Sequence, residues 1–167
     1  MRDLSELPDV LQFMRLLWAV VHAAERASKR MRSEVGVTGP QRLVLRVVGI
    51  FPGVSAGDLA AILHVHPSTL TGVLQRLVAR RLLERVPDRA DRRRAVLRLT
   101  PRGIRANTVK RGTVEAVVAE ALRAVSPRDR AATRRVLARL AAQLDSHVAM
   151  SARPPHGSAA GKSVRGD

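Results

Sequence analysis

Apolar residues recur every three or four positions over most of the chain, and this spacing predicts a mainly helical protein. The longest such stretch runs from Leu7 to Val35, carries two apolar stripes and is ended by Gly36. A helix of about 28 residues would be about 42 Å long. A single small domain does not need that length. We therefore expect one face of this helix to contact a partner subunit.

Pairs of polar residues predict where further helices begin. A hydroxyl side chain followed three residues later by Gln or Asp is typical of a capping box, in which the two side chains satisfy backbone amides at a helix start. The pairs are Thr38 with Gln41, Ser55 with Asp58, and Ser126 with Asp129. They predict a second helix that ends before Pro52, a short third helix to Leu63, and a last helix to Val148.

A fourth helix is predicted from Pro67 to about Arg80, directly after a turn at residues 64–66. One side of its helical wheel is apolar, with Leu70, Val73, Leu74 and Leu77. The other side is small and mostly uncharged, with Ser68, Gly72, Gln75 and Ala79 flanked by Thr69, Thr71 and Arg76. A solvated helix face is usually rich in Glu and Lys, whereas hydroxyls, an amide and small residues suit insertion into a DNA groove.

Strand-like spacing replaces helical spacing after the fourth helix. One short strand ends at Pro87, and a second runs from Ala95 to Thr100. The segment between them, Asp88 to Arg94, predicts a charged hairpin loop. Residues 76–98 contain nine arginines and three carboxylates, a net charge of +6 beside the fourth helix. A fifth helix is predicted from Pro101 through Leu122, with a bend at Gly112.

Composition narrows the function classes further. The chain has 167 residues, and its 30 Lys and Arg against 14 Asp and Glu give a formal charge of +16, which favours a polyanion partner. Nearly all these cations are Arg, a usage that coding bias can produce, so their placement must carry the argument. Aromatic residues make up only 2%, which disfavours the base stacking of single-stranded RNA recognition. The absence of cysteine excludes disulfides, thiolate zinc sites and cysteine catalysis.

The remaining candidate chemistry is sparse. The sequence has no nucleophile elbow, phosphate-cradling glycine loop or paired carboxylate set, so we expect no enzyme and no cofactor. His64 and His66 lack neighbouring carboxylate or cysteine ligands, which favours helix entry and phosphate contact over a metal site. The longest apolar run, Leu16 to Val21, is too short for a signal core or membrane span. We expect a soluble cytoplasmic protein with no membrane partner.

Several segments in this order resemble the MarR family of bacterial transcription regulators over about residues 7–148. They are Pro52-Gly53-Val54-Ser55 with Asp58-Leu59-Ala60, then Ser68-Thr69-Leu70-Thr71 with Arg76-Leu77, then Asp88 and Asp91-Arg92-Arg93, and finally Leu97-Arg98-Leu99-Thr100-Pro101-Arg102-Gly103. The resemblance implies a winged helix-turn-helix with long terminal helices that hold a homodimer. Such a dimer would bind double-stranded DNA at a palindromic operator and usually repress transcription.

The resemblance also implies roles for individual residues. Base contacts would come from Ser68, Thr69, Thr71, Gln75 and Arg76, and the wing would contact the minor groove through Arg89, Arg92 and Arg93. Asp88 and Asp91 would organise the wing, either by orienting a guanidinium or by holding the turn. Members of the family often bind small aromatic or anionic effectors, and the candidate ligand-binding residues here are Trp18, His22, Arg46 and Phe51.

The expected organisation is a dimerisation helix at 1–37, a DNA-binding lobe at 38–100, C-terminal dimerisation helices at 101–150 and a Pro-, Gly- and Ser-rich disordered tail at 151–167. Two positions depart from the family pattern: Arg81 replaces a common glycine, and Gly72 replaces a common basic residue. Gly72 costs roughly 1 kcal/mol of helix propensity, and it either permits close approach to DNA or is neutral. An alternative function is a non-specific basic or architectural DNA-binding protein without ligand response. An operator-specific regulator would instead prefer its site by about 10³-fold or more.

Overall fold

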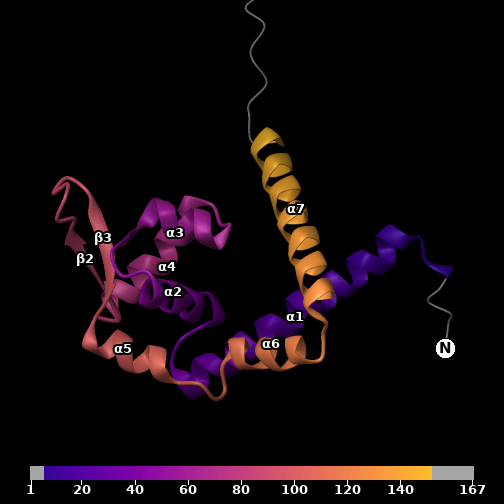
Figure 1. Cartoon of the computed structure of the whole chain (residues 1–167), viewed down its shortest axis with the longest axis horizontal. Helices are drawn as coiled ribbons and strands as arrows, with labels where there is room; N and C mark the ends of the chain where they lie inside the picture. The colour runs from indigo at the N-terminus through magenta and orange to yellow at the C-terminus, as the bar shows by residue number, and fades with distance from the viewer. Residues whose placement is uncertain (1–5, 152–167) are drawn as a thin grey trace, which may run out of the picture. The chain divides into compact units, whose positions relative to one another are not determined.

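The computed structural model describes residues 6–151, in which helices dominate and three short strands form one sheet (Figure 1). The chain divides into two compact units, residues 1–125 and residues 126–167. Within the described residues, the first unit contains helices α1 to α6 and the sheet, and the second contains α7. The predicted fold class, mainly α with a small β-hairpin wing, is confirmed.

The first helix, α1 (Asp9–Val35), covers nearly all of the predicted segment. It ends at Gly36, whose φ of +82° is left-handed backbone that glycine adopts without steric cost, and the Gly36 N–H donates to the Arg32 carbonyl. Met31 is buried near this end, whereas the large apolar side chains of the N-terminal two thirds are mostly exposed. α1 is therefore anchored at one end and leaves a long apolar surface uncovered.

The second helix, α2 (Gly39–Ile50), begins with the predicted capping box. The Gln41 N–H donates to the Thr38 hydroxyl at 3.4 Å, and the Thr38 N–H donates to Gln41 Oε1 at 3.1 Å. One side of α2 is buried, with Val44, Leu45 and Val48 almost inaccessible to solvent. This side makes α2 the central helix of the first unit, in contact with α1, α4, α5 and β3.

A helix-turn-helix follows, formed by α3 (Ala56–Leu63) and α4 (Pro67–Ala79). The side of α4 predicted to be apolar is buried, namely Leu70, Val73, Leu74 and Leu77. Leu59 of α3 packs in the same core. Each buried leucine contributes roughly 1.5–3 kcal/mol. The opposite side of α4 is consequently held toward solvent.

The sheet contains the predicted hairpin and one strand that the sequence analysis missed. β2 (Leu83–Pro87) and β3 (Ala95–Leu99) pair antiparallel, with Leu83 opposite Leu99 and Pro87 opposite Ala95. β1 (Val54–Ser55) pairs with β3 on its other side, in the order β1-β3-β2. Two residues are too few to display alternating hydrophobicity, so the sequence alone does not reveal β1.

The predicted fifth helix is wrong in its length, because the segment forms two helices. α5 (Pro101–Thr108) and α6 (Val114–Arg123) are separated by five residues. The C-cap residue of α5, Val109, has extended backbone, and Gly112 follows in the connection with a left-handed φ of +69°. The Thr113 hydroxyl then accepts a hydrogen bond from the Ala116 N–H as the cap of α6. Gly112 therefore belongs to a helix break, where a bend was expected.

The second unit contains α7 (Pro127–Ser151). At its start the Asp129 N–H donates to the Ser126 hydroxyl at 3.1 Å, while the Ser126 hydroxyl donates to the Asp129 carboxylate. Ser55 and Asp58 make the same contacts before α3, so both pairs cap their helices without the return bond of a full capping box. The predicted tail, apart from Ser151, lies outside the described residues. No helix within residues 6–151 is long and apolar enough to cross a membrane.

Candidate nucleic-acid interface

The turn of the helix-turn-helix is fixed by its two histidines. α3 ends at His64, whose φ of +50° is left-handed, and α4 begins after His66, whose Nδ1 accepts from the Ser68 N–H at 3.3 Å. The same ring nitrogen lies 2.7 Å from the Ser68 hydroxyl. His66 thus lies at a helix entry, as the sequence favours, whereas His64 is the C-cap residue of the preceding helix. Among residues 6–151, no three His, Asp or Glu side chains gather into a group that could hold a metal ion.

The outward face of α4 carries every predicted base-contacting side chain of that helix. All of them are exposed: Ser68, Thr69, Thr71, Gln75 and Arg76. The Thr71 hydroxyl donates to the Pro67 carbonyl at 2.8 Å, which leaves its oxygen lone pairs available as acceptors. Gln75 makes no side-chain hydrogen bond to any described residue. This face therefore offers the Gln75 amide and the Thr71 acceptor lone pairs, which the protein itself does not occupy.

The wing turn is held by its two aspartates. Asp88 Oδ1 accepts from the Ala90 N–H at 2.9 Å, and Asp91 Oδ1 accepts from the Arg93 N–H at 3.0 Å. Backbone bonds from Asp88 N–H to the Arg94 carbonyl, and from Arg94 N–H to the Asp91 carbonyl, close the loop at 2.9 Å each. Of the two roles expected for these aspartates, the structure supports holding the turn.

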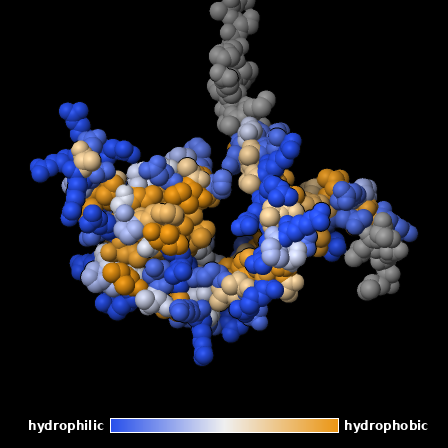
Figure 2. All heavy atoms as spheres, viewed as in Figure 1, coloured by the Kyte–Doolittle hydropathy of each residue, from blue (hydrophilic) through white to orange (hydrophobic). Residues whose placement is uncertain are grey.

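The predicted wing arginines project from this turn. Arg89, Arg92 and Arg93 are exposed, and none of them forms an ion pair with a residue in the described part of the chain. Figure 2 shows hydrophilic side chains gathered at the tip of the β2–β3 hairpin. Unpaired arginines at the tip of a hairpin have the charge and reach to enter a minor groove or contact phosphates.

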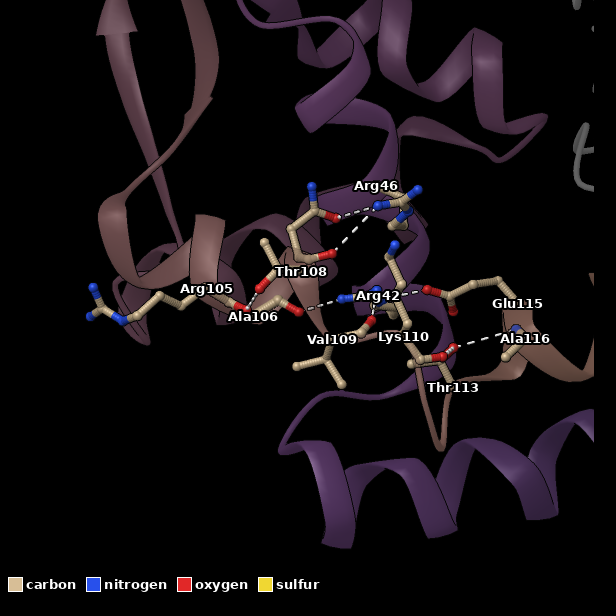
Figure 3. A network of polar contacts seen from close by, with 11 residues as sticks. Arg42, Arg46, Arg105, Ala106, Thr108, Val109, Lys110, Thr113, Glu115 and Ala116 are labelled. Carbon is tan, nitrogen blue, oxygen red and sulfur yellow. Dashed lines mark hydrogen bonds and ion pairs between the residues drawn. The ribbon is translucent and has the colours of Figure 1, made fainter.

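Sequence analysis missed one buried charged residue, which joins α2 to the connection between α5 and α6. Arg42 of α2 is only 2% exposed, and its guanidinium donates to the carbonyls of Ala106 and Val109 and forms a 2.6 Å ion pair with Glu115 (Figure 3). It thereby satisfies carbonyls that the break between α5 and α6 leaves without helical partners. The sequence does indicate that Arg42 is buried, because this residue occupies a position on the buried stripe of α2.

The predicted ligand-binding residues fall into two separate pairs. The Trp18 and His22 rings of α1 lie edge to face, with 5.2 Å between centroids. Arg46 of α2 donates to Asn107 at 3.4 Å, and the half-exposed Phe51 is the C-cap residue of the same helix. A pocket of about 380 Å³ lies between α1 and α6 and contains none of these four residues. Beside it, the hydrogen bond and charge of Glu34 raise the pKa of Arg30.

A helix-turn-helix followed by a basic hairpin defines a winged helix-turn-helix DNA-binding protein. Comparison with known families gives the particular class: residues 35–94 match the MarR family. Over these residues, which contain the helix-turn-helix and the first strand of the wing, the chain resembles the MarR family of transcription regulators.

Individual relatives agree with this assignment. The HTH-type transcriptional regulator TtmR of Methylorubrum extorquens is 34% identical over 87 residues, which cover 52% of this chain but only 45% of TtmR. The PcaV regulator of Streptomyces coelicolor, solved with its natural ligand, is 27% identical with a TM-score of 0.63, covering 84% of this chain and 96% of PcaV. A mutant MarR of E. coli solved with operator DNA has the same fold, with 22% identity, a TM-score of 0.63, and coverage of 83% and 99%.

Proposed function

We propose that this chain is a homodimeric repressor that binds a palindromic operator through α4 and the wing and is released by a small aromatic or anionic effector. Action on chromosomal DNA implies a cytoplasmic location. The observation that carries the proposal is the pairing of an exposed polar face on α4, where Gln75 is unoccupied and Thr71 keeps its acceptor lone pairs, with unpaired arginines on the wing. The first can discriminate base edges, and the second supplies attraction to phosphate.

Uncovered apolar surface supports the homodimer. Val10 and Trp18 on α1 are 63% and 67% exposed, Val117 on α6 is 64% exposed, and on α7 Val148 is 67% exposed. Figure 2 also shows hydrophobic side chains at the surface along α1. Apolar surface of this extent does not persist on soluble monomers, and a second copy with the same surface would cover it. Light scattering should give twice the 18.2 kDa chain mass, and a monomer at micromolar concentration would contradict the dimer.

The effector part of the proposal rests on exposed aromatic and cationic groups. Trp18 offers an exposed ring in edge-to-face contact with His22, and Arg46 and Phe51 offer a cation and a second ring on α2. Rings bind aromatic ligands by stacking, and a guanidinium binds carboxylates. The ligand-bound structure of the related PcaV adds support. A small aromatic carboxylate such as benzoate should raise the melting temperature of the protein but not that of a Trp18→Ala variant.

The experiment that tests sequence recognition is a double substitution, Thr71→Ala with Gln75→Ala. Neither residue is charged, so their loss leaves counterion release unchanged while removing hydrogen bonds to bases worth roughly 1–3 kcal/mol for a good contact. Affinity for an operator obtained by in vitro selection should fall about tenfold or more, with little change on scrambled DNA at the same salt concentration.

A matched control is Thr108→Ala with Gln143→Ala, which makes the same chemical changes at exposed positions of α5 and α7. The control should bind operator like the unmodified protein. A parallel loss on operator and scrambled DNA in the Thr71 and Gln75 variant would refute base recognition by α4. The non-specific DNA-binding alternative would then be favoured.

A further inference from the structure

A groove that no predicted function explains lies where the end of α1, the start of α2 and the end of α4 meet. Its volume is about 710 Å³. Three arginines line it: Arg32 from α1, Arg76 from α4 and Arg80 at the C-cap of α4. None of the lining residues is acidic. Among the described residues, none of the three guanidiniums has an ion pair or a side-chain hydrogen bond.

Local geometry directs two of these guanidiniums. A Cβ added at Gly36 would lie 3.5 Å from Arg80 Nη2, so the Arg80 side chain crosses from α4 to the end of α1. At Gly72 an added Cβ would lie 3.7 Å and 3.8 Å from the two terminal nitrogens of Arg76, so Arg76 lies back along its own helix. Both glycines leave space beside the guanidiniums. The groove consequently brings Arg32 of α1 together with two arginines from the end of α4, although α1 and α4 are far apart in sequence.

The polar groups in the remaining wall of the groove already form hydrogen bonds within the protein. Thr38 and Gln41 bond each other in the capping box, and the Gly39 N–H donates to the Ser28 hydroxyl at 2.8 Å. The start of α2 therefore has few free donors to offer, and the unsatisfied groups of the groove are the three cations. Three like charges around one concave surface focus a positive potential, and guanidiniums match phosphate oxygens in bidentate geometry.

We propose that this arginine groove binds a phosphate group through Arg32, Arg76 and Arg80. The group comes either from a free phosphorylated small molecule or from the DNA backbone beside the sequence that α4 contacts. Because Arg76 is also a predicted base-contacting residue, a free phosphate compound held in the groove would compete with operator DNA. The groove would then be an effector site separate from Trp18 and His22. This competition, though not the binding itself, rests on the proposed function.

The test begins without DNA. Inorganic pyrophosphate is titrated into the full-length protein by calorimetry at constant ionic strength set with chloride. The variants are Arg32→Gln and Arg80→Gln, and the control is Arg111→Gln, which removes one exposed charge outside the groove. Because each lost guanidinium removes charge-assisted hydrogen bonds, both groove variants should bind pyrophosphate about tenfold or more weakly, while the control should bind normally. Circular dichroism melts verify that each variant remains folded.

A second arm distinguishes the two sources of phosphate. The salt dependence of binding to a random-sequence duplex is measured for the same variants, because each arginine bound to backbone phosphate contributes about one released ion per protomer. If the groove variants lose pyrophosphate binding but keep the salt slope of the unmodified protein, the phosphate group comes from a free compound. A lower slope in both groove variants, without pyrophosphate binding by the unmodified protein, identifies the DNA backbone.

Two outcomes overturn the proposal. In one, pyrophosphate binds equally to the unmodified protein and all three variants, so it is held elsewhere on this basic chain. In the other, pyrophosphate does not bind and the groove variants keep the salt slope of the Arg111→Gln control. Neither outcome depends on operator recognition, which the Thr71 and Gln75 variant tests separately.

Discussion

Replacing Glu115 with glutamine removes the carboxylate that the structure pairs with the buried Arg42. The ion pair joins α2 to the first turn of α6 at 2.6 Å, and the Arg42 side chain is 3% exposed while the Glu115 side chain is 41% exposed. The substitution keeps the size of the side chain and its hydrogen-bonding oxygen. It therefore isolates the charge of Glu115.

The expected magnitude follows from these exposures. Removing one partner of a fully buried ion pair costs roughly 3–5 kcal/mol, because the remaining charge has no compensation. Here solvent reaches Glu115, and Arg42 keeps its bonds to the Ala106 and Val109 carbonyls. Screening by water lowers the cost to about 1–2 kcal/mol. Arg42→Met also leaves both carbonyls unpaired, and we expect it to cost about 2–4 kcal/mol.

The assay is a double-mutant cycle followed by urea unfolding. Because a dimer unfolds in a concentration-dependent manner, all four proteins are compared at one concentration. The cycle should give a coupling free energy of about 1–2 kcal/mol between the two positions. The ion pair would contribute nothing to stability if the losses of the two single variants summed to that of the double variant within about 0.3–0.5 kcal/mol. A Glu115→Gln variant as stable as the unmodified protein would give the same conclusion.

Three other substitutions test individual features. Arg81 has a φ of +54°, a conformation that costs L-residues about 1–2 kcal/mol. Arg81→Gly should therefore raise the free energy of unfolding by about 1 kcal/mol, and a variant less stable than the unmodified protein would contradict backbone strain at Arg81. Gly72→Ala should also stabilise by about 1 kcal/mol, since its Cβ would make ordinary contacts with Arg76, and the operator affinity of the same variant decides between close approach and neutrality. Arg92→Ala should weaken operator binding and reduce the salt slope by about one ion per protomer without altering the circular dichroism spectrum; an unchanged slope would remove Arg92 from the interface.

The fold was largely predictable where local chemistry determines it. The α4 face pattern, the Thr38–Gln41 box and the Gly36 terminus are set by residues within one or two helical turns, and the structure confirms all three. The β2–β3 hairpin follows the same logic, because strand-like spacing flanks a charged loop.

Features that depend on distant partners escaped prediction. β1 exists only because Val54 meets Leu97, and the break between α5 and α6 is supported by Arg42, more than sixty residues away in sequence. Arg81 and Gly72 were recognised as departures from the family pattern. The left-handed backbone at Arg81, however, is visible only in the structure. The arginine groove was also missed, because Arg32 of α1 meets the two arginines at the end of α4 only in the folded chain.

The measurement that tests the central claim most directly is a footprint on a duplex obtained by in vitro selection, combined with the stoichiometry of the complex. If two copies of α4 enter successive major grooves, selection should enrich an inverted repeat with half-sites about 10 base pairs apart. Two protected regions should appear on one face of the duplex, with two chains bound per site. Selection that enriches no motif, with protection spread uniformly along the DNA, would contradict an operator-binding dimer and favour a non-specific basic DNA-binding protein.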